Sequence, residues 1–145
     1  MVDALISFSR LSPLLVMVFV LPLGALVYFS NRSGHLNVLF FLLSIAMSFF
    51  ALACSVQGIT RVDSVAYIFD YILYLSAIAS VNVFVLFTAE FTKIDRSKIL
   101  VYVLPVTICL LILNFTPLFR VDVLLRYNNR YIIQPAIGWY VFFVY

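Results

Sequence analysis

Residues 64–91, SVAYIFDYILYLSAIASVNVFVLFTAEF, decide the fold, because they are long and apolar enough to cross a bilayer yet contain Asp70 and Asn82. A helix of roughly 20 residues crosses a hydrocarbon core about 30 Å thick. Ionisable side chains within such spans usually face the interior of a helix bundle and mark functional sites. We therefore expect the helix face that carries Asp70 to point inward.

That face is polar and rich in tyrosine. At about 100° per residue, five side chains fall within about a third of the helix circumference: Tyr67, Asp70, Tyr71, Tyr74 and Asn82. The ligand-binding or signalling candidates are Asp70, Tyr67, Tyr74 and Asn82. An alternative stays open, in which Asp70 lies near the interface as a solvated or helix-capping carboxylate and the tyrosines form an aromatic belt.

The composition identifies an integral membrane protein. Of the 145 residues, 66% are hydrophobic and 10% are charged, against about 25% charged residues in a soluble domain. The net charge of +3 does not indicate nucleic-acid binding, since the basic residues lie between apolar runs, where membrane topology places them. Cys54 and Cys109 lie within apolar runs without a metal-binding spacing, so we predict packing roles for both, no metal site and no cofactor.

The apolar runs predict an all-α, polytopic transmembrane helical bundle with four complete spans and the start of a fifth. The predicted spans are residues 11–30, 36–56, 64–91, 99–116 and, truncated, 138–145. Because the fifth run is too short to cross a bilayer, we expect residues 1–145 to be an incomplete membrane domain of a longer protein. Pro22 and Pro105 predict kinks in the first and fourth spans.

The second span carries small residues at spacings of four, three and four, namely Ser44, Ser48, Ala51 and Ser55. These positions share one helix face, and small side chains allow two helices to approach closely. We predict that this face is a helix-packing seam. The polar segment 57–63 is interpreted as a loop that leads into the third span.

The segment before the fifth run has a near-mirror pattern around Asn128 and Asn129. Asparagine tolerates positive φ angles, so a two-residue turn there predicts a small β-hairpin with strands at residues 121–127 and 130–134. An amphipathic surface helix is the alternative, because the apolar residues of 121–125 also suit helical spacing.

The distribution of basic residues predicts the orientation of the chain in the membrane only if the segment after Pro117 is left out of the count. The loop with Lys93, Arg96 and Lys98 favours the cytoplasmic side, which places the amino terminus outside. Counted over the whole chain, the inner loops then carry four basic residues and the outer segments five. If the segment after Pro117 folds as its own unit and is left out, the inner loops carry four basic residues and the outer segments two.

The pattern resembles the amino-terminal seven-helix membrane region of bacterial and archaeal sensor histidine kinases, which also occurs on diguanylate cyclases. The resemblance rests on the short loop 31–37, on Phe84, Phe87 and Phe91, on the exit from the fourth span at 114–119, and on Gly138, Trp139 and Tyr140. It implies a multi-pass protein of the bacterial inner (plasma) membrane with its amino terminus outside, the segment 121–134 over the mouth of the bundle, and a homodimer formed through an output module beyond residue 145.

The functional expectation is a sensory input domain that passes an extracellular or membrane stimulus, such as an unidentified small molecule, to a cytoplasmic histidine kinase or cyclase module. We see no catalytic constellation in the sequence and expect no enzymatic activity from these residues alone. The expected partners of this input domain are the lipid bilayer and the stimulus. A fragment of a small-solute transporter or channel is the alternative, since kinked helices and an intramembrane carboxylate also suit a translocation path; a membrane-embedded enzyme is a third.

Overall fold

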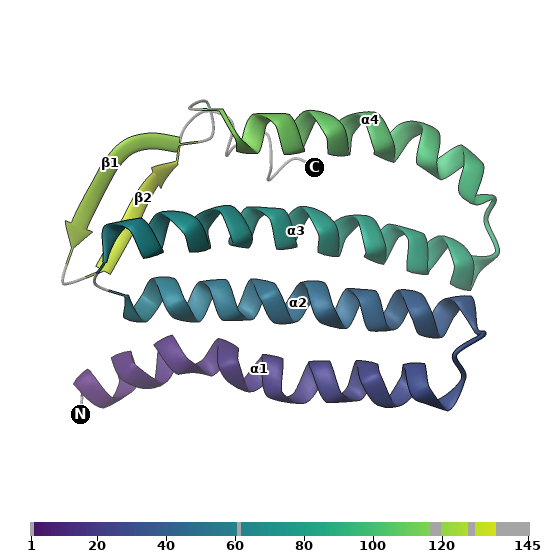
Figure 1. The fold of residues 1–145 in the computed structure, drawn as a ribbon, viewed down its shortest axis with the longest axis horizontal. Coiled ribbons are helices and arrows are strands. Elements are labelled where there is room, and N and C mark those ends of the chain that lie inside the picture. Colours follow the sequence, from purple (N-terminus) through teal and green to yellow (C-terminus); the bar gives the residue numbers. More distant parts are fainter. Residues whose placement is uncertain (1, 61, 117–119, 128–129, 136–145) are drawn as a thin grey trace.

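The computed structural model describes residues 2–60, 62–116, 120–127 and 130–135, with side chains placed for 12–60 and 62–116. It contains four long helices, α1 (Val2–Ser30), α2 (His35–Ile59), α3 (Asp63–Thr92) and α4 (Arg96–Asn114). Successive helices are antiparallel, and each packs mainly against its neighbours in sequence. The helices therefore form a single layer in chain order, as Figure 1 shows.

All four helices are long and apolar enough to span a membrane. The third predicted span matches α3 to within one residue at each end. The fourth predicted span, 99–116, corresponds to α4, which begins and ends earlier. The predicted fifth span at 138–145 lies outside the described residues.

Two helices extend beyond the predicted spans. The apolar span within α1 is Ser12–Ser30, in agreement with the predicted span 11–30, but the helix itself begins at Val2 and continues through Pro13 and Pro22. The predicted loop 57–63 is mostly helical, because α2 continues to Ile59. Gln57 was interpreted as part of the loop because of its polarity, but its side chain has a partner on α3 and the helix extends past it.

The first two helices are joined by a tight turn. The backbone N–H of Gly34 donates to the carbonyl of Asn31 at 3.3 Å, and the Asn37 amide donates to the same carbonyl at 3.0 Å. These bonds satisfy backbone groups at the end of α1 that would otherwise lack partners. The short connection makes α1 and α2 antiparallel neighbours.

Two short strands follow α4, β1 (Arg120–Tyr127) and β2 (Arg130–Pro135). They pair antiparallel with Tyr127 opposite Arg130, and the register is irregular between Arg120 and Leu124. The strands lie at the end of the layer where α2 ends and α3 begins, and β2 contacts α2 (Figure 1). The proposed turn residues Asn128 and Asn129 lie outside the described residues.

The closest helix contact lies between α1 and α2. Gly24 is buried, and a Cβ atom added to it would overlap with the Cβ and Oγ atoms of Ser44. Nearby, the rings of Tyr28 and Phe41 stack at a centroid distance of 5.0 Å. The absent side chain of Gly24 therefore lets the backbones of α1 and α2 approach closely, as small residues do in membrane helix pairs.

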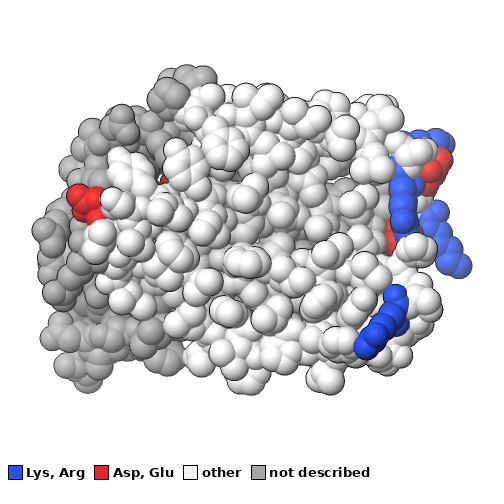
Figure 2. Space-filling view, viewed as in Figure 1, with Lys and Arg blue, Asp and Glu red and all other residues white. Residues whose placement is uncertain are grey.

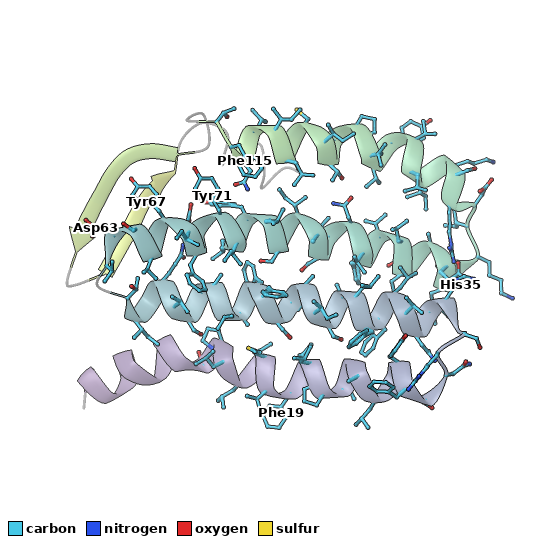
Figure 3. All side chains as sticks on the ribbon, viewed as in Figure 1. Phe19, His35, Asp63, Tyr67, Tyr71 and Phe115 are labelled. Carbon is cyan, nitrogen blue, oxygen red and sulfur yellow. The ribbon has the colours of Figure 1, made fainter. Side chains whose placement is uncertain are left out.

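The helices expose large apolar side chains along most of their length. Phe19 on α1 is 72% exposed and points away from the layer (Figure 3), and Val101 on α4 is 68% exposed. Figure 2 shows a broad uncharged band, with the charged side chains gathered at the two ends of the helices. This distribution suits a protein whose middle is surrounded by lipid and whose ends lie in the headgroup regions.

Candidate functional site

Asp70 lies between α2 and α3. Its side chain is only 4% exposed, and its Oδ1 atom accepts a hydrogen bond from the Gln57 side-chain amide at 3.1 Å. A carboxylate is costly to bury in an apolar environment unless hydrogen-bond donors compensate. The Gln57 donor therefore helps to stabilise the acid at the α2–α3 interface.

Small residues make room for this pair. Ala53 lies one turn before Gln57 on α2, and Ala66 lies one turn before Asp70 on α3; neither has any exposed surface. Residues four apart share a helix face. The polar pair is thus flanked by two alanines that permit close approach of the two helices.

One and two turns after Asp70, buried side chains of α3 contact α4. Tyr74 and Ile78 are buried and pack with Leu110 of α4 in one cluster. Asn114 is 1% exposed and lies one turn beyond Leu110, so it shares the face that meets α3. The structure therefore gathers four buried or half-buried polar side chains at one end of the layer, which we call the acidic-end cluster: Gln57, Asp70, Tyr74 and Asn114.

Two further tyrosines lie at the edge of this cluster. The Tyr71 ring stacks on Phe115, just after the end of α4, with centroids 5.8 Å apart. Figure 3 shows that Tyr67 and Tyr71 point toward the side of α3 that carries α4 and the strands. Tyr67 is half-buried and Tyr71 is 38% exposed.

The helix length sets the depth of Asp70. The apolar stretch between Asp70 and Glu90 on α3 contains 19 residues, which at 1.5 Å per residue span about 28 Å, close to the thickness of a hydrocarbon core. The two carboxylates therefore bracket one bilayer crossing, each with a partner: Gln57 for Asp70 and Arg96 for Glu90. Asp70 is buried between the helices and lies two turns after the beginning of α3, so it is neither a solvated carboxylate nor a cap of the first turn, although it lies close to the expected interface.

Asn82 does not belong to the acidic-end cluster. It lies 12 residues beyond Asp70 on α3, about 18 Å farther along the helix, and its amide donates to the Ile78 carbonyl at 2.7 Å. Its Oδ1 atom accepts a hydrogen bond from the Thr107 hydroxyl of α4 at 2.6 Å. The expectation that Asn82 and Asp70 share one face and point inward together needs correction, because Asp70 contacts α2 and Asn82 contacts α4.

The four small residues of the second span are all buried: Ser44, Ser48, Ala51 and Ser55. The hydroxyls of Ser44 and Ser48 donate to carbonyls one turn earlier in α2, at 2.9 and 2.7 Å. Internal bonds of this kind let serine lie in an apolar interface. Ser44 faces Gly24 of α1, so this part of the stripe lies in the α1–α2 contact.

Sequence reasoning missed Gln57, Thr107 and Asn114. In the sequence-based prediction, Gln57 lies in the loop 57–63, Asn114 lies at the exit from the fourth span, and Thr107 has no assigned role. A polar residue in the last turn of a span, opposite an acid in the first turns of the next antiparallel span, is the signal that could have found Gln57.

Within the described residues, no group of three histidine, cysteine, aspartate or glutamate side chains is arranged to bind a metal ion. No family model matches the chain, and neither the curated proteins nor the solved structures compared with it give a match.

Proposed function

We propose that this chain is the membrane-embedded input domain of a signal-transduction protein, which relays a small-molecule or membrane stimulus to a cytoplasmic histidine kinase or cyclase module. The observation that supports the proposal most strongly is the Gln57–Asp70 pair, a charged group held between two spans close to the membrane surface. Intramembrane ionisable residues of this kind mark functional sites.

The pair suits a switch because the hydrogen bond between the Gln57 and Asp70 side chains joins α2 to α3. A stimulus that competes for Asp70, or that moves the residues around it, favours a different packing of α2 against α3. A signal needs only a stimulus with unequal affinity for two helix arrangements. The α3–α4 contact is the less extensive of the two, so displacement of α3 is transmitted to α4 through few residues, among them Ile78 and Leu110.

We propose the orientation in which the amino terminus and the acidic-end cluster face the outside of a bacterial inner membrane. The basic residues whose side chains are placed, Arg32, Lys93, Arg96 and Lys98, lie at the opposite end, and basic loops favour the cytoplasm. The pairing of β1 with β2 supports the condition that the segment after Pro117 folds as its own unit. In this proposal the two strands form a hairpin at Asn128 and Asn129 that covers the outer mouth, and a fifth span begins near residue 138.

The signalling proposal is tested in membranes that contain the full-length protein. We expect phosphorylation from labelled ATP, or cyclic dinucleotide formation from GTP, and a changed basal output in Asp70→Asn. The matched control is Asp63→Asn, which removes an exposed carboxylate from the same helix and should leave the output unchanged. Solute uptake by vesicles, with neither output reaction, contradicts the sensor and supports a transporter.

The orientation is tested by labelling single cysteines in intact cells with a membrane-impermeant maleimide. We expect Asn129→Cys to be labelled and Ser97→Cys to be protected until the membrane is permeabilised. The reverse pattern inverts the topology.

A further inference from the structure

The end of the layer opposite the acidic-end cluster carries four basic residues with placed side chains, Arg32, Lys93, Arg96 and Lys98, and we call it the cationic end. Figure 2 shows these basic side chains gathered at one extremity beyond the uncharged band. Arg32 lies in the connection between α1 and α2, Lys93 lies in the connection between α3 and α4, and Arg96 and Lys98 lie in the first turn of α4. The antiparallel order of the helices brings these three segments to the same level. The same end carries two carboxylates, Glu90 and Asp95.

Both carboxylates already have partners inside the protein. The Arg96 guanidinium forms an ion pair with Glu90, in which its Nε atom lies 2.7 Å from Oε2. The Asp95 carboxylate caps α4 and accepts hydrogen bonds from the Ser97 backbone N–H at 3.0 Å and from the Ser97 hydroxyl at 2.8 Å. These bonds hold the pKa of Asp95 below its usual value. Among the described residues, no carboxylate pairs with Arg32, Lys93 or Lys98.

The unpaired cations lie beside exposed apolar side chains. The Arg32 guanidinium stacks over the Phe29 ring at 4.8 Å, and that ring is 60% exposed. On the other connection, Phe91 is 69% exposed and Ile94 is 54% exposed, one on each side of Lys93. Aromatic and cationic side chains at the same level are typical of the membrane interface, where the rings lie among the lipid chains and the cations reach the headgroups.

The backbone holds Lys93 in a defined position. Its φ angle is 57°, the left-handed region, and it is the one described non-glycine residue with a positive φ. The N–H of Ile94 donates to the Ala89 carbonyl at 2.9 Å, which closes the end of α3 as a helix-terminating turn. Lys98 follows within the first turn of α4, where the helix dipole adds positive potential.

From these observations we propose that the cationic end binds the phosphate groups of anionic phospholipids, with Lys93, Lys98 and Arg32 in the headgroup layer and Phe29, Phe91 and Ile94 among the upper acyl chains. The occupant is bilayer lipid because the three cations lie at the boundary of the apolar band and are interleaved with exposed apolar side chains. A small soluble anion would contact the cations but would leave the neighbouring apolar side chains exposed. The contact fixes both helix connections at one depth in the membrane and is independent of signalling.

The test measures which lipids contact the cationic end. Residues 1–145 with Phe91→Trp and Trp139→Phe, in which the one tryptophan lies beside Lys93, are reconstituted into phosphatidylcholine vesicles that contain phosphatidylglycerol. Fluorescence quenching is compared between brominated phosphatidylglycerol and brominated phosphatidylcholine. We expect about a threefold preference for phosphatidylglycerol, in keeping with the attraction of a few basic residues to anionic lipid.

The Lys93→Gly/Lys98→Gln variant should reduce this ratio to about one. Glycine suits the positive φ at residue 93, so the change removes charge without straining the turn. The charge-retaining Lys93→Arg/Lys98→Arg variant should keep the preference, and helix content by circular dichroism should match in all variants.

Equal quenching by the two lipids in the parent protein, or an unchanged preference in the Lys93→Gly/Lys98→Gln variant, overturns the proposal. Loss of the preference in inorganic phosphate, but not in sodium chloride of the same ionic strength, also overturns it, since that result assigns the cations to a soluble anion.

Discussion

Hydrogen bonds between side chains of different helices lie at both the α2–α3 and the α3–α4 interface, and two of them, Gln57–Asp70 and Thr107–Asn82, differ in charge and depth. The Gln57–Asp70 bond involves a carboxylate and lies close to the beginning of α3. The Thr107–Asn82 bond joins two neutral groups and lies about 18 Å farther along α3, near the middle of the 28 Å crossing. A charge is thus placed where water and headgroups are close, and only a neutral pair is placed at the centre of the bilayer.

This difference follows from the energetics of the bilayer. A carboxylate at the centre of a span costs about 2.5 to 3.5 kcal/mol on insertion scales. A neutral hydrogen bond between membrane helices contributes about 0.6 kcal/mol on average. The Asn82–Thr107 pair therefore orients α4 against α3 at low cost, and Asp70, close to the beginning of α3, avoids the full cost of a carboxylate at the centre of a span.

The largest expected effect comes from moving the charge to the centre. The Asn82→Asp variant places a carboxylate opposite Thr107, and we expect the apparent free energy of membrane insertion of the third span to rise by up to about 3 kcal/mol. A glycosylation-based insertion assay measures this quantity. Asp70→Asn is the matched control and should leave insertion unchanged or improve it; an equal response to both changes contradicts the difference in depth.

A smaller loss is expected when the acid loses its donor. Gln57→Leu leaves the buried Asp70 carboxylate without the amide, and we expect the protein in detergent to lose about 1.5 kcal/mol of stability, since a hydrogen bond to a charged group contributes about 1.5 to 3 kcal/mol. Unfolding in denaturing detergent measures the change. The Gln57→Leu/Asp70→Leu double variant removes both polar groups and should recover most of the loss. If the double variant is no more stable than Gln57→Leu, the two side chains are not coupled.

The neutral pair should contribute less. A double-mutant cycle with Asn82→Ala and Thr107→Val should give a coupling energy of about 0.6 kcal/mol, and at most about 1.7 kcal/mol. Thr88→Val is a suitable control on α3, because its hydroxyl bonds only within its own helix. A coupling larger than that of Gln57 with Asp70 reverses the comparison.

The smallest expected effect lies outside the membrane, at the amino-terminal end of α4. Because the Ser97 bonds lower the pKa of Asp95 below its usual value of 3.8, the capping interaction is fully present above that value and is lost as the pH falls through the lower pKa of the folded state. We expect the first turn of α4 to lose protection against amide hydrogen exchange only below about pH 4, with little effect on the rest of the protein. Asp95→Ala should show the low-protection behaviour at all pH values; equal pH dependence in both proteins contradicts the capping role.

The positions of the spans could be predicted from the sequence because apolar length alone determines them. The third span agrees with α3 to within one residue, and the depth of Asp70 follows from counting residues to Glu90. Partners between helices could not be predicted in this way. Asp70 and Asn82 differ by about 120° around α3, and a helical wheel does not say which neighbouring helix lies on which side.

Gly24 illustrates the same limit. In the sequence it stands beside Pro22 and suggests a kink, whereas in the structure its missing side chain admits Ser44 of α2. The second-span stripe predicts close packing, but the residue that meets it on α1 depends on the relative shift of two antiparallel helices. That shift is set by the length of the connection at residues 31–34, which periodicity does not report.

The central claim, that Asp70 lies between α2 and α3 and is shielded from lipid, is tested most directly by disulfide crosslinking in a background with Cys54→Ala and Cys109→Ala. We predict rapid oxidative crosslinking of Gln57→Cys/Asp70→Cys in native membranes. The control pair Ile59→Cys/Ile68→Cys, on the same two helices at a comparable level but with exposed side chains, should not crosslink. Crosslinking of the control pair without crosslinking of residues 57 and 70 would show that the acid faces the lipid and would contradict the account.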